Sequence, residues 1–245
     1  MENEIIVKDQ RDSGKTEYYL ESLLDPEQQH NVEREYKFEQ LMMMYGCAIR
    51  EVRTKLEVLN DDLTSRYERN PIEHIHSRIK EPISIAKKLK KMNVPVCSES
   101  IPGNLSDVAG IRVICSFIDD IYTVAGMLIR QDDITLIKMK DYIEHPKPNG
   151  YRSLHLIVEV PVFFADVTRN MRVEVQIRTI AMDFWASLDH HLRYKKDVKD
   201  AEMIEQELKR CAEVIAKTDA DMLWIRKKIF ADDKVLETKN LWKEE

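Results

Sequence analysis

The chain has 245 residues, with 38 Lys and Arg against 44 Asp and Glu, and a formal net charge of −6 at pH 7. Because affinity for nucleic acid comes mainly from neutralised phosphates, this acidic balance argues against an extended nucleic-acid-binding surface. The four cysteines, Cys47, Cys97, Cys115 and Cys211, form no Cys-x-x-Cys pair and predict neither a zinc knuckle nor a disulfide framework.

Residues 1–24 are polar and show no sustained hydrophobic period. The first predicted element is a long helix that follows this segment. Asp25-Pro26-Glu27 supplies an N-cap, a proline at the first helical position and an acid in the first turn. Apolar residues then recur at steps of three or four: Leu41, Tyr45, Ala48, Val52, Leu56, Leu59, Leu63 and Tyr67. This stripe predicts one helix, with a bend at Gly46 as an option, that ends at Asn70-Pro71. The apolar face of this helix either packs on the protein's own core or contacts another subunit.

A short helix over residues 82–92, ending before Pro95, is predicted next. Around it the charge is concentrated, because residues 78–91 contain six basic residues and one acid. Such a patch suits a small polyphosphate inside an acidic protein, and a solvated helix face is the alternative.

The rest of the chain alternates between strand and helix patterns. Strands are predicted at 111–117, 134–140, 154–160 and 172–178, and helices at 120–131, 179–195 and 199–230. The last two strands, joined around 166–170, form an expected antiparallel pair. Strands with helices before, between and after them indicate an α+β domain built on a mixed sheet.

Polar side chains gather at two of these strands. Apolar and polar residues alternate over 173–178, which places Glu174, Gln176 and Arg178 together on one face of a strand. Asp107 precedes a small-residue turn that leads into another strand, with Arg112 just after the turn. Two carboxylates from separate strands suit Mg²⁺, which keeps several waters and needs only one or two carboxylates. The structural alternative is that Asp107 caps a turn and Glu174 pairs with Arg178 or a neighbouring strand.

Five sequence blocks occur in the order found in one enzyme family. They are Ser77-Arg78-Ile79-Lys80 with Lys87-Lys88-Leu89, then residues 107–112, 147–155, 173–179 and 181–190. The chain resembles the synthetase domain of the RelA/SpoT-type alarmone synthetases, and among them the stand-alone small alarmone synthetases of the RelP type.

The resemblance implies a fold, a division of the chain and an activity. The expected fold is an α+β, nucleotidyltransferase-like domain with a mixed β-sheet flanked by helices, with N- and C-terminal helical extensions. Residues 1–69 and 196–245 are the expected extensions, and 70–195 the catalytic domain. The expected activity is transfer of pyrophosphate from ATP to the 3′-hydroxyl of GDP or GTP, which makes ppGpp and pppGpp for the stringent response, without hydrolase activity. A homotetramer in the cytoplasm that uses Mg²⁺ is also implied.

The family motif implies roles for the residues on the donor side. Asp107 and Glu174 are the expected catalytic residues and Mg²⁺ ligands, with Glu174 also the general base for the acceptor hydroxyl. Arg78 and Arg112 match the pair that sandwiches the adenine of ATP. Planar guanidinium groups suit a base face and lysines suit phosphates, and Lys80 and Lys88 match the phosphate contacts. Gln176 is expected to orient Glu174 or the ribose.

The acceptor side is assigned in the same way. Tyr151 follows a turn, Asn149-Gly150, at an exposed position where its ring can stack on guanine. Lys147 and His155 match residues that hold the acceptor phosphates, although an isolated histidine on a strand is often only a hydrogen-bonding residue. Asp183 and Asp189 occupy positions that contact the guanine edge in the family, where Glu often stands in place of Asp189.

Other functions remain as alternatives. A related nucleotidyltransferase would share the carboxylates and the basic patch, and a nucleotide sensor or RNA-binding regulator without catalysis would dispense with Glu174. His74 with His76, or His190 with His191, suggests a metal site, but residues one or two apart do not share a helix face. Charges interrupt every apolar run before the ~18 residues that a membrane span needs, and no basic-then-apolar leader opens the chain, so we expect a cytoplasmic protein.

Overall fold

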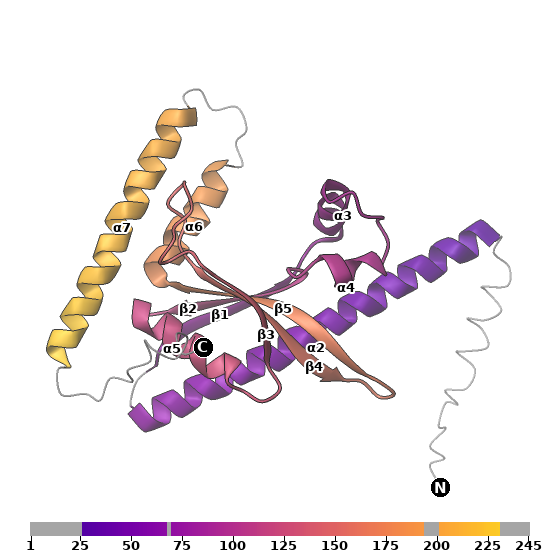
Figure 1. Ribbon diagram of the computed structural model, residues 1–245, viewed down its shortest axis with the longest axis horizontal. Helices are drawn as coiled ribbons and strands as arrows, with labels where there is room; N and C mark the ends of the chain where they lie inside the picture. The colour runs from indigo at the N-terminus through magenta and orange to yellow at the C-terminus, as the bar shows by residue number, and fades with distance from the viewer. Residues whose placement is uncertain (1–25, 68–69, 194–200, 231–245) are drawn as a thin grey trace, which may run out of the picture.

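The computed structural model describes residues 26–67, 70–193 and 201–230. The helices and strands follow one another as α2 (Pro26–Tyr67), β1 (Ile72–Ile79), α3 (Pro82–Lys91), α4 (Ser100–Asn104), β2 (Ala109–Cys115), α5 (Ile118–Ile129), β3 (Thr135–Asp141), β4 (Leu154–Phe163), β5 (Thr168–Thr179), α6 (Ile180–Arg193) and α7 (Ala201–Ile229). The strands form one five-stranded sheet in the order β1-β2-β5-β4-β3 (Figure 1).

The sheet is mixed, as the sequence predicts. β2 and β5 are parallel, whereas β1 with β2, β5 with β4 and β4 with β3 are antiparallel. The expected antiparallel pair of β4 and β5 is therefore confirmed, and so is the α+β class. The parallel pair lies in the middle of the sheet, where β2 and β5 place residues from distant parts of the chain side by side.

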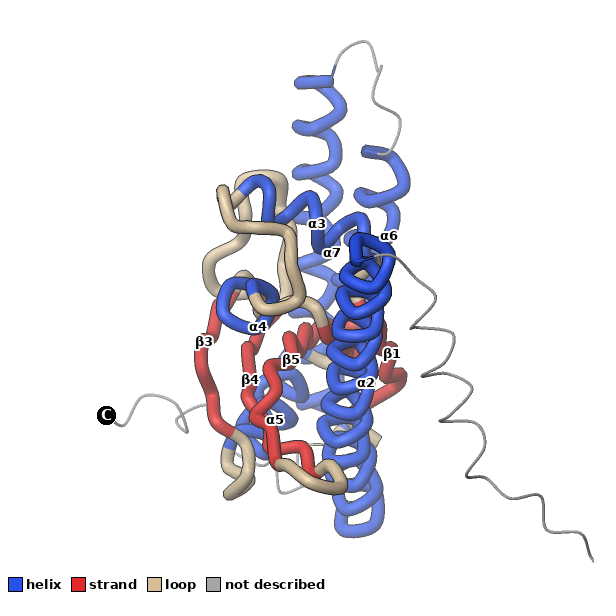
Figure 2. Tube along the Cα trace, turned by 90° about the vertical axis from the view of Figure 1, so that its right-hand side faces the viewer, coloured by secondary structure: helices blue, strands red, loops and turns tan. Residues whose placement is uncertain are grey.

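One face of the sheet carries the hydrophobic core. Residues such as Val113, Val175 and Leu156 point to this face and are fully buried against α2 and α5. Figure 2 shows α2 running along the sheet. On α2, Tyr45 and Val52 are among the buried residues of the predicted stripe, so the stripe packs on the protein's own core.

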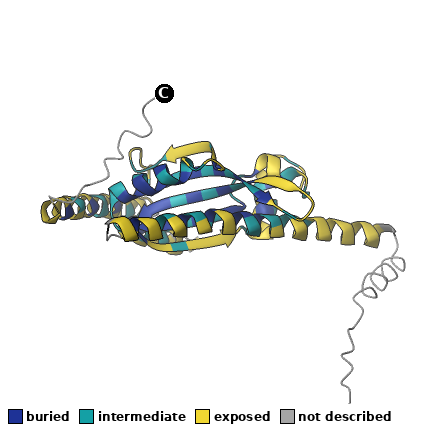
Figure 3. Cartoon of the chain, turned by 90° about the horizontal axis from the view of Figure 1, so that it is seen from below, coloured by how far each residue is buried: buried dark blue, intermediate teal, exposed yellow. Residues whose placement is uncertain are grey.

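The helix α2 is one uninterrupted element of 42 residues that passes through Gly46. Its N-terminal part extends beyond the sheet and is exposed, drawn yellow in Figure 3. At the opposite end of the sheet, α6 and α7 pack against each other, with Trp185 Nε1 donating to the Leu208 carbonyl oxygen at 2.9 Å. Arg226 joins α7 to α5 through two hydrogen bonds to Asp119, of 3.0 and 2.6 Å.

Two elements differ from the sequence prediction. β1 was not predicted, because its apolar residues Ile72, Ile75 and Ile79 have the three- and four-residue spacing of a helix. Pairing with β2 decides its conformation, which is a case of tertiary context overriding local pattern. α4 is too short to show a period. Within the described residues, no helix is long and apolar enough to cross a membrane.

Candidate active site

The face of the sheet opposite α2 carries the predicted polar side chains. Gly110 of β2 lies opposite Glu174 of β5 and Arg112 lies opposite Gln176, while His155 of β4 flanks Gln176 on its other side. Directly opposed residues project to the same face of a sheet, so these side chains meet. A cleft of about 290 Å³ opens there, lined by His76, Ser77, Arg78, Asp107, Gly110, Ile111, Arg112, Glu174 and Gln176.

Asp107, in the loop before β2, is held by two lysines. Its Oδ2 lies 3.1 Å from Nζ of Lys80 and 2.7 Å from Nζ of Lys88. Burial of the carboxyl opposes its charge, but the hydrogen bonds from Lys88 and Lys80 outweigh burial and hold the pKa of Asp107 below its ordinary value. The expectation that Asp107, Lys80 and Lys88 belong to one site therefore fits the geometry.

Glu174 is fixed through both of its carboxylate oxygens. Oε1 lies 3.2 Å from Nδ1 of His155, and Oε2 accepts a hydrogen bond of 2.9 Å from Nε2 of Gln176. Burial acts to raise the pKa of Glu174, yet the hydrogen bond and charge interaction with His155 prevail and lower it. Of the structural alternatives for Glu174, the pairing with a neighbouring strand is the one present, through His155 of β4, while Gln176 lies between Glu174 and Arg178.

A chain of hydrogen bonds runs from Arg178 to Glu174. Nη2 of Arg178 donates to the hydroxyl of Tyr151, and that hydroxyl lies 2.8 Å from Nε2 of His155. Because the Glu174 carboxylate can only accept, Nδ1 of His155 carries a proton and donates to Oε1. Arg178 itself is only 4% exposed and also bonds Gln176 and Asp183, at 3.0 and 3.1 Å. Sequence reasoning left its role undecided.

The two arginines of the expected adenine site lie on neighbouring strands. Arg78 of β1 pairs with Gly110, two residues from Arg112 on β2, and both line the cleft. Nη1 of Arg112 lies 3.3 Å from Oδ1 of Asp183, while its Nε is buried without a hydrogen-bond partner among the described residues. Burial, followed by the charge of Arg178, lowers the pKa of the Arg112 guanidinium.

The loop before β4 forms an aromatic cluster. Nζ of Lys147 lies 4.7 Å from the ring centres of both Tyr142 and Tyr151. Tyr142 also stands edge-on to His155, with ring centres 5.2 Å apart, and sequence reasoning missed it because its pattern marks only a strand end. Tyr151 is half-buried rather than exposed, since its hydroxyl is tied to His155 and Arg178.

The two aspartates of α6 lie on different sides of the helix. Asp183 contacts both Arg112 and Arg178, which connects it to the cleft. Asp189 follows six residues later, about 240° around the helix from Asp183. A contact between Asp189 and the guanine edge stays a prediction.

The histidine pairs require one correction. His74 and His76 lie on strand β1, where residues two apart do share a face, and their ring centres are 6.1 Å apart. The spacing argument against a metal site was thus wrong for this pair. In the part of the chain that the structure describes, no group of three or more His, Cys, Asp or Glu side chains is arranged to hold a metal ion.

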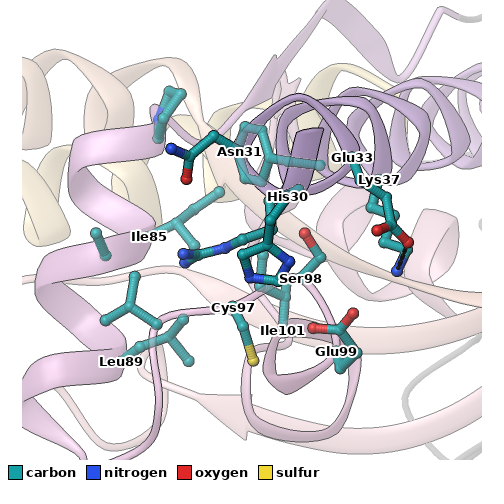
Figure 4. Close-up of a pocket in the computed structure, with 15 residues that line it drawn as sticks. His30, Asn31, Glu33, Lys37, Ile85, Leu89, Cys97, Ser98, Glu99 and Ile101 are labelled. Atoms are coloured by element: carbon teal, nitrogen blue, oxygen red, sulfur yellow. Dashed lines mark ion pairs between the residues drawn. The ribbon is translucent and has the colours of Figure 1, made fainter. Parts of the chain in front are cut away.

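A larger cavity, of about 580 Å³, lies away from these residues, between α2 and the α3–α4 segment. In Figure 4, Ile85 and Leu89 reach into it from α3, and Glu33 and Lys37 form an ion pair on α2. The residues that line this larger cavity do not include Asp107 or Glu174, and they do not include Arg78 or Arg112. The smaller cleft is therefore the candidate active site.

A mixed sheet that presents two carboxylates beside lysines and arginines defines an enzyme that handles nucleotide phosphates. The model of the region found in RelA / SpoT proteins matches residues 77–199 of the chain. GTP pyrophosphokinase YwaC of Bacillus subtilis is 42% identical over 188 residues, which cover 77% of this chain and 90% of that protein. The chain belongs to the RelA/SpoT family, and within it to the small alarmone synthetases.

Solved structures agree with this assignment. The crystal structure of small alarmone synthetase 2 from Bacillus subtilis matches with a TM-score of 0.70 and 42% identity, covering 78% of this chain and 98% of that one. Small alarmone synthetase 1 from the same organism, bound to its product pppGpp, matches with a TM-score of 0.72 and 34% identity, covering 78% and 97%. The same enzyme bound to AMPCPP matches with a TM-score of 0.67 and 31% identity, covering 79% of this chain and 98% of that one.

Proposed function

We propose that this small alarmone synthetase, a GTP pyrophosphokinase that makes (p)ppGpp, uses ATP as donor and either GDP or GTP as acceptor in the cleft between Asp107 and Glu174. The 3′-oxygen of the acceptor attacks the β-phosphorus of ATP, the bond to the α-phosphate breaks, and AMP leaves. The observation that carries the proposal is that Asp107 and Glu174 line one cleft, with Asp107 in contact with Lys80 and Lys88 and Glu174 in contact with His155. The bound AMPCPP and pppGpp of the Bacillus relative are consistent with these substrates.

Glu174 is the general base for the 3′-hydroxyl. A base must be ionised at working pH and held within reach of the proton that it accepts. The lowered pKa of Glu174 satisfies the first condition. The hydrogen bonds from His155 and Gln176 fix the orientation of its carboxylate and support the second.

Asp107 and Glu174 also fit a magnesium ion. Oδ1 of Asp107 is buried and has no hydrogen-bond partner among the described residues, which suits an oxygen that awaits a cation. Asp107 and Glu174 line the same cleft, which supports a shared ion. Bound Mg²⁺ would neutralise charge on the transferred phosphates.

The donor nucleotide is held by the basic residues of the cleft. Lys80 and Lys88, which neutralise Asp107 in this structure, are the cations for the triphosphate. Arg78 is exposed at the cleft and Arg112 carries a buried Nε without a partner among the described residues, which supports the adenine sandwich.

The acceptor binds at the aromatic cluster. Lys147 covers the ring of Tyr151 in this structure, so a guanine that stacks on this ring displaces the lysine, which then meets the acceptor phosphates. His155 remains tied to Glu174 and Tyr151 and joins the acceptor site to the base. Asp183 supports this side through Arg178. A homotetramer located in the cytoplasm completes the proposal.

Synthesis from labelled ATP tests the proposed reaction. With γ-labelled ATP, Mg²⁺ and GDP or GTP, labelled ppGpp or pppGpp should be resolved by thin-layer chromatography. With α-labelled ATP, the label should appear in AMP and never in the guanosine product. Label from α-labelled ATP in the guanosine product would instead identify a nucleotidyltransferase.

A further inference from the structure

A separate cavity of about 250 Å³ lies between the acceptor loop, residues 146–152, and helix α7. Its walls include Lys147, Gly150, Arg152, Lys209, Ala212 and Glu213. The cavity has room for a small group such as a phosphate.

The contact between the loop and α7 is built by a glycine. Gly150 has a φ of +88°, and a Cβ at this position would stand 2.5 Å from Cβ of Ala212. The amide of Gly150 donates to the Lys147 carbonyl oxygen at 2.8 Å, which closes the turn. Only glycine allows both the backbone conformation and the close approach, so the loop is seated directly on α7.

The charged residues that line this cavity are mainly cationic: Lys147, Arg152 and Lys209 against one acid, Glu213. Nε of Arg152 is buried and has no hydrogen-bond partner among the residues that the structure describes. A buried donor without a partner is costly, and an anion bound in the cavity would lie beside the Arg152 guanidinium.

One further carboxylate lies near Arg152. Asp219 of α7 accepts a hydrogen bond of 2.6 Å from the buried hydroxyl of Thr179. Burial raises the pKa of Asp219, against the effect of the Arg152 charge. Nε of Arg152 makes no hydrogen bond to Asp219 or to any other described residue.

Lys147 is common to the cavity and the acceptor cluster. This residue lines the cavity and also lies 4.7 Å from the centre of the Tyr151 ring, on which the acceptor base is proposed to stack. Phosphates that Lys147 holds are thereby directed toward Arg152 and Lys209.

We propose that this cavity is a subsite for the terminal phosphate of the acceptor nucleotide, and that Arg152 and Lys209 make the enzyme favour GTP over GDP. The inference rests on the proposed acceptor site at Tyr151 and Lys147. GDP ends one phosphate earlier and leaves the subsite empty, while GTP places its γ-phosphate there. Charge-assisted hydrogen bonds to that phosphate supply the discrimination.

The substitution Lys209→Gln tests the subsite, because Lys209 is exposed on α7 and its replacement leaves the core unchanged. Lys217→Gln, at another exposed lysine of the same helix outside the cavity, is the matched control. The ratio of the KM for GTP to the KM for GDP should rise about fivefold in Lys209→Gln, as expected for the loss of one charged contact, and stay unchanged in the control. Arg152→Gln should raise the same ratio.

Each other outcome overturns the inference. An unchanged ratio in Lys209→Gln and Arg152→Gln, or an equal rise of both KM values, would remove the terminal phosphate from this cavity. Orthophosphate is assayed as well: if it alters synthesis from GDP in the wild type but not in Lys209→Gln while the ratio stays unchanged, the cavity serves free phosphate instead. Absence of any alarmone synthesis by the wild type would reject the proposed function itself, which separates the two failures.

Discussion

His155 of β4 and Glu174 of β5 meet diagonally across the two strands, with Nδ1 of the histidine 3.2 Å from Oε1 of the glutamate. The hydroxyl of Tyr151 holds the other nitrogen of His155 at 2.8 Å. The proposed acceptor-binding ring and the proposed base are therefore joined through a single imidazole. A substitution at Tyr151 should therefore affect Glu174, and a substitution at Glu174 should affect Tyr151.

Glu174→Gln should abolish pyrophosphate transfer and leave the fold intact, because the amide keeps the shape of the side chain but cannot accept the proton. Initial rates with ATP and GDP measure the effect, and thermal unfolding checks the fold. Glu159→Gln is the matched control, since Glu159 lies on β4, pairs with Arg172 at 3.4 Å and does not line the cleft. Transfer by Glu174→Gln above about a tenth of the wild-type rate would remove the base role, because loss of general-base catalysis costs about a hundredfold or more.

The pKa of Glu174 predicts a pH dependence of stability. Burial opposes ionisation, but the interaction with His155 leaves the folded-state pKa below the ordinary value of 4.5. The unfolded chain then binds the proton more readily, so Glu174 stabilises the fold above pH 4.5 and this contribution is lost as the pH falls through the folded-state pKa. Urea unfolding of the wild type and Glu174→Gln from pH 7 to pH 3 should show the difference in unfolding free energy shrinking only at the acid end. A difference that is constant with pH would contradict the lowered pKa.

Asp107→Asn should reduce transfer to a small residual rate, and this residual activity should require more Mg²⁺, since one proposed carboxylate ligand is lost. The substitution leaves Lys80 and Lys88 without their shared counter-charge, and their mutual repulsion then disfavours the empty cleft. Titration of the residual rate with Mg²⁺ measures the change. An unaltered Mg²⁺ requirement would show that Asp107 acts only as a partner of the lysines.

Tyr151→Ala should weaken binding of GDP and GTP about tenfold and ATP binding much less, because a stacked base is worth ~1–3 kcal/mol. Tyr151→Phe should keep most of the affinity but lower kcat, since His155 loses the hydroxyl that holds Nε2. Calorimetric titration of each nucleotide, together with initial rates, separates the two effects. Equal losses for ATP and GDP in the alanine variant would indicate a collapsed loop, and no loss at all would place the guanine elsewhere.

Thr179→Val should destabilise the protein by about 1–3 kcal/mol, because one buried hydroxyl makes two hydrogen bonds. It caps the start of α6 by accepting from the Met182 amide at 3.1 Å, and it donates to Asp219 of α7. Thr179→Ser keeps the hydroxyl and should retain most of the stability. Urea unfolding compares the variants, and equal stability of Thr179→Val and wild type would contradict the role.

The parts of the site that the sequence predicts are those with a local pattern. Alternation over residues 173–178 is enough to place Glu174 and Gln176 on one face, and the family motif names Asp107 and its lysines. Strand β1 has no such pattern, because it is an exposed edge whose apolar residues have helical spacing.

Contacts between distant segments could not be predicted in the same way. Arg178 meets Tyr151 and Asp183 only because β5, the acceptor loop and α6 converge. The partners of a buried arginine depend on this convergence and not on its neighbours in sequence. The close approach of Gly150 to Ala212 of α7 could not be predicted from neighbouring residues either.

The parallel pairing of β2 with β5 also determines when the catalytic centre can form. Asp107 precedes β2 and Glu174 lies in β5, so helix α5 and strands β3 and β4 must be synthesised before the two carboxylates can meet. Parallel strands require such a long connection, and non-local pairing is slow to form. A growing chain that ends before β5 therefore cannot bring the two carboxylates together. During translation, the capacity to make (p)ppGpp arises only after residue 179 has left the ribosome.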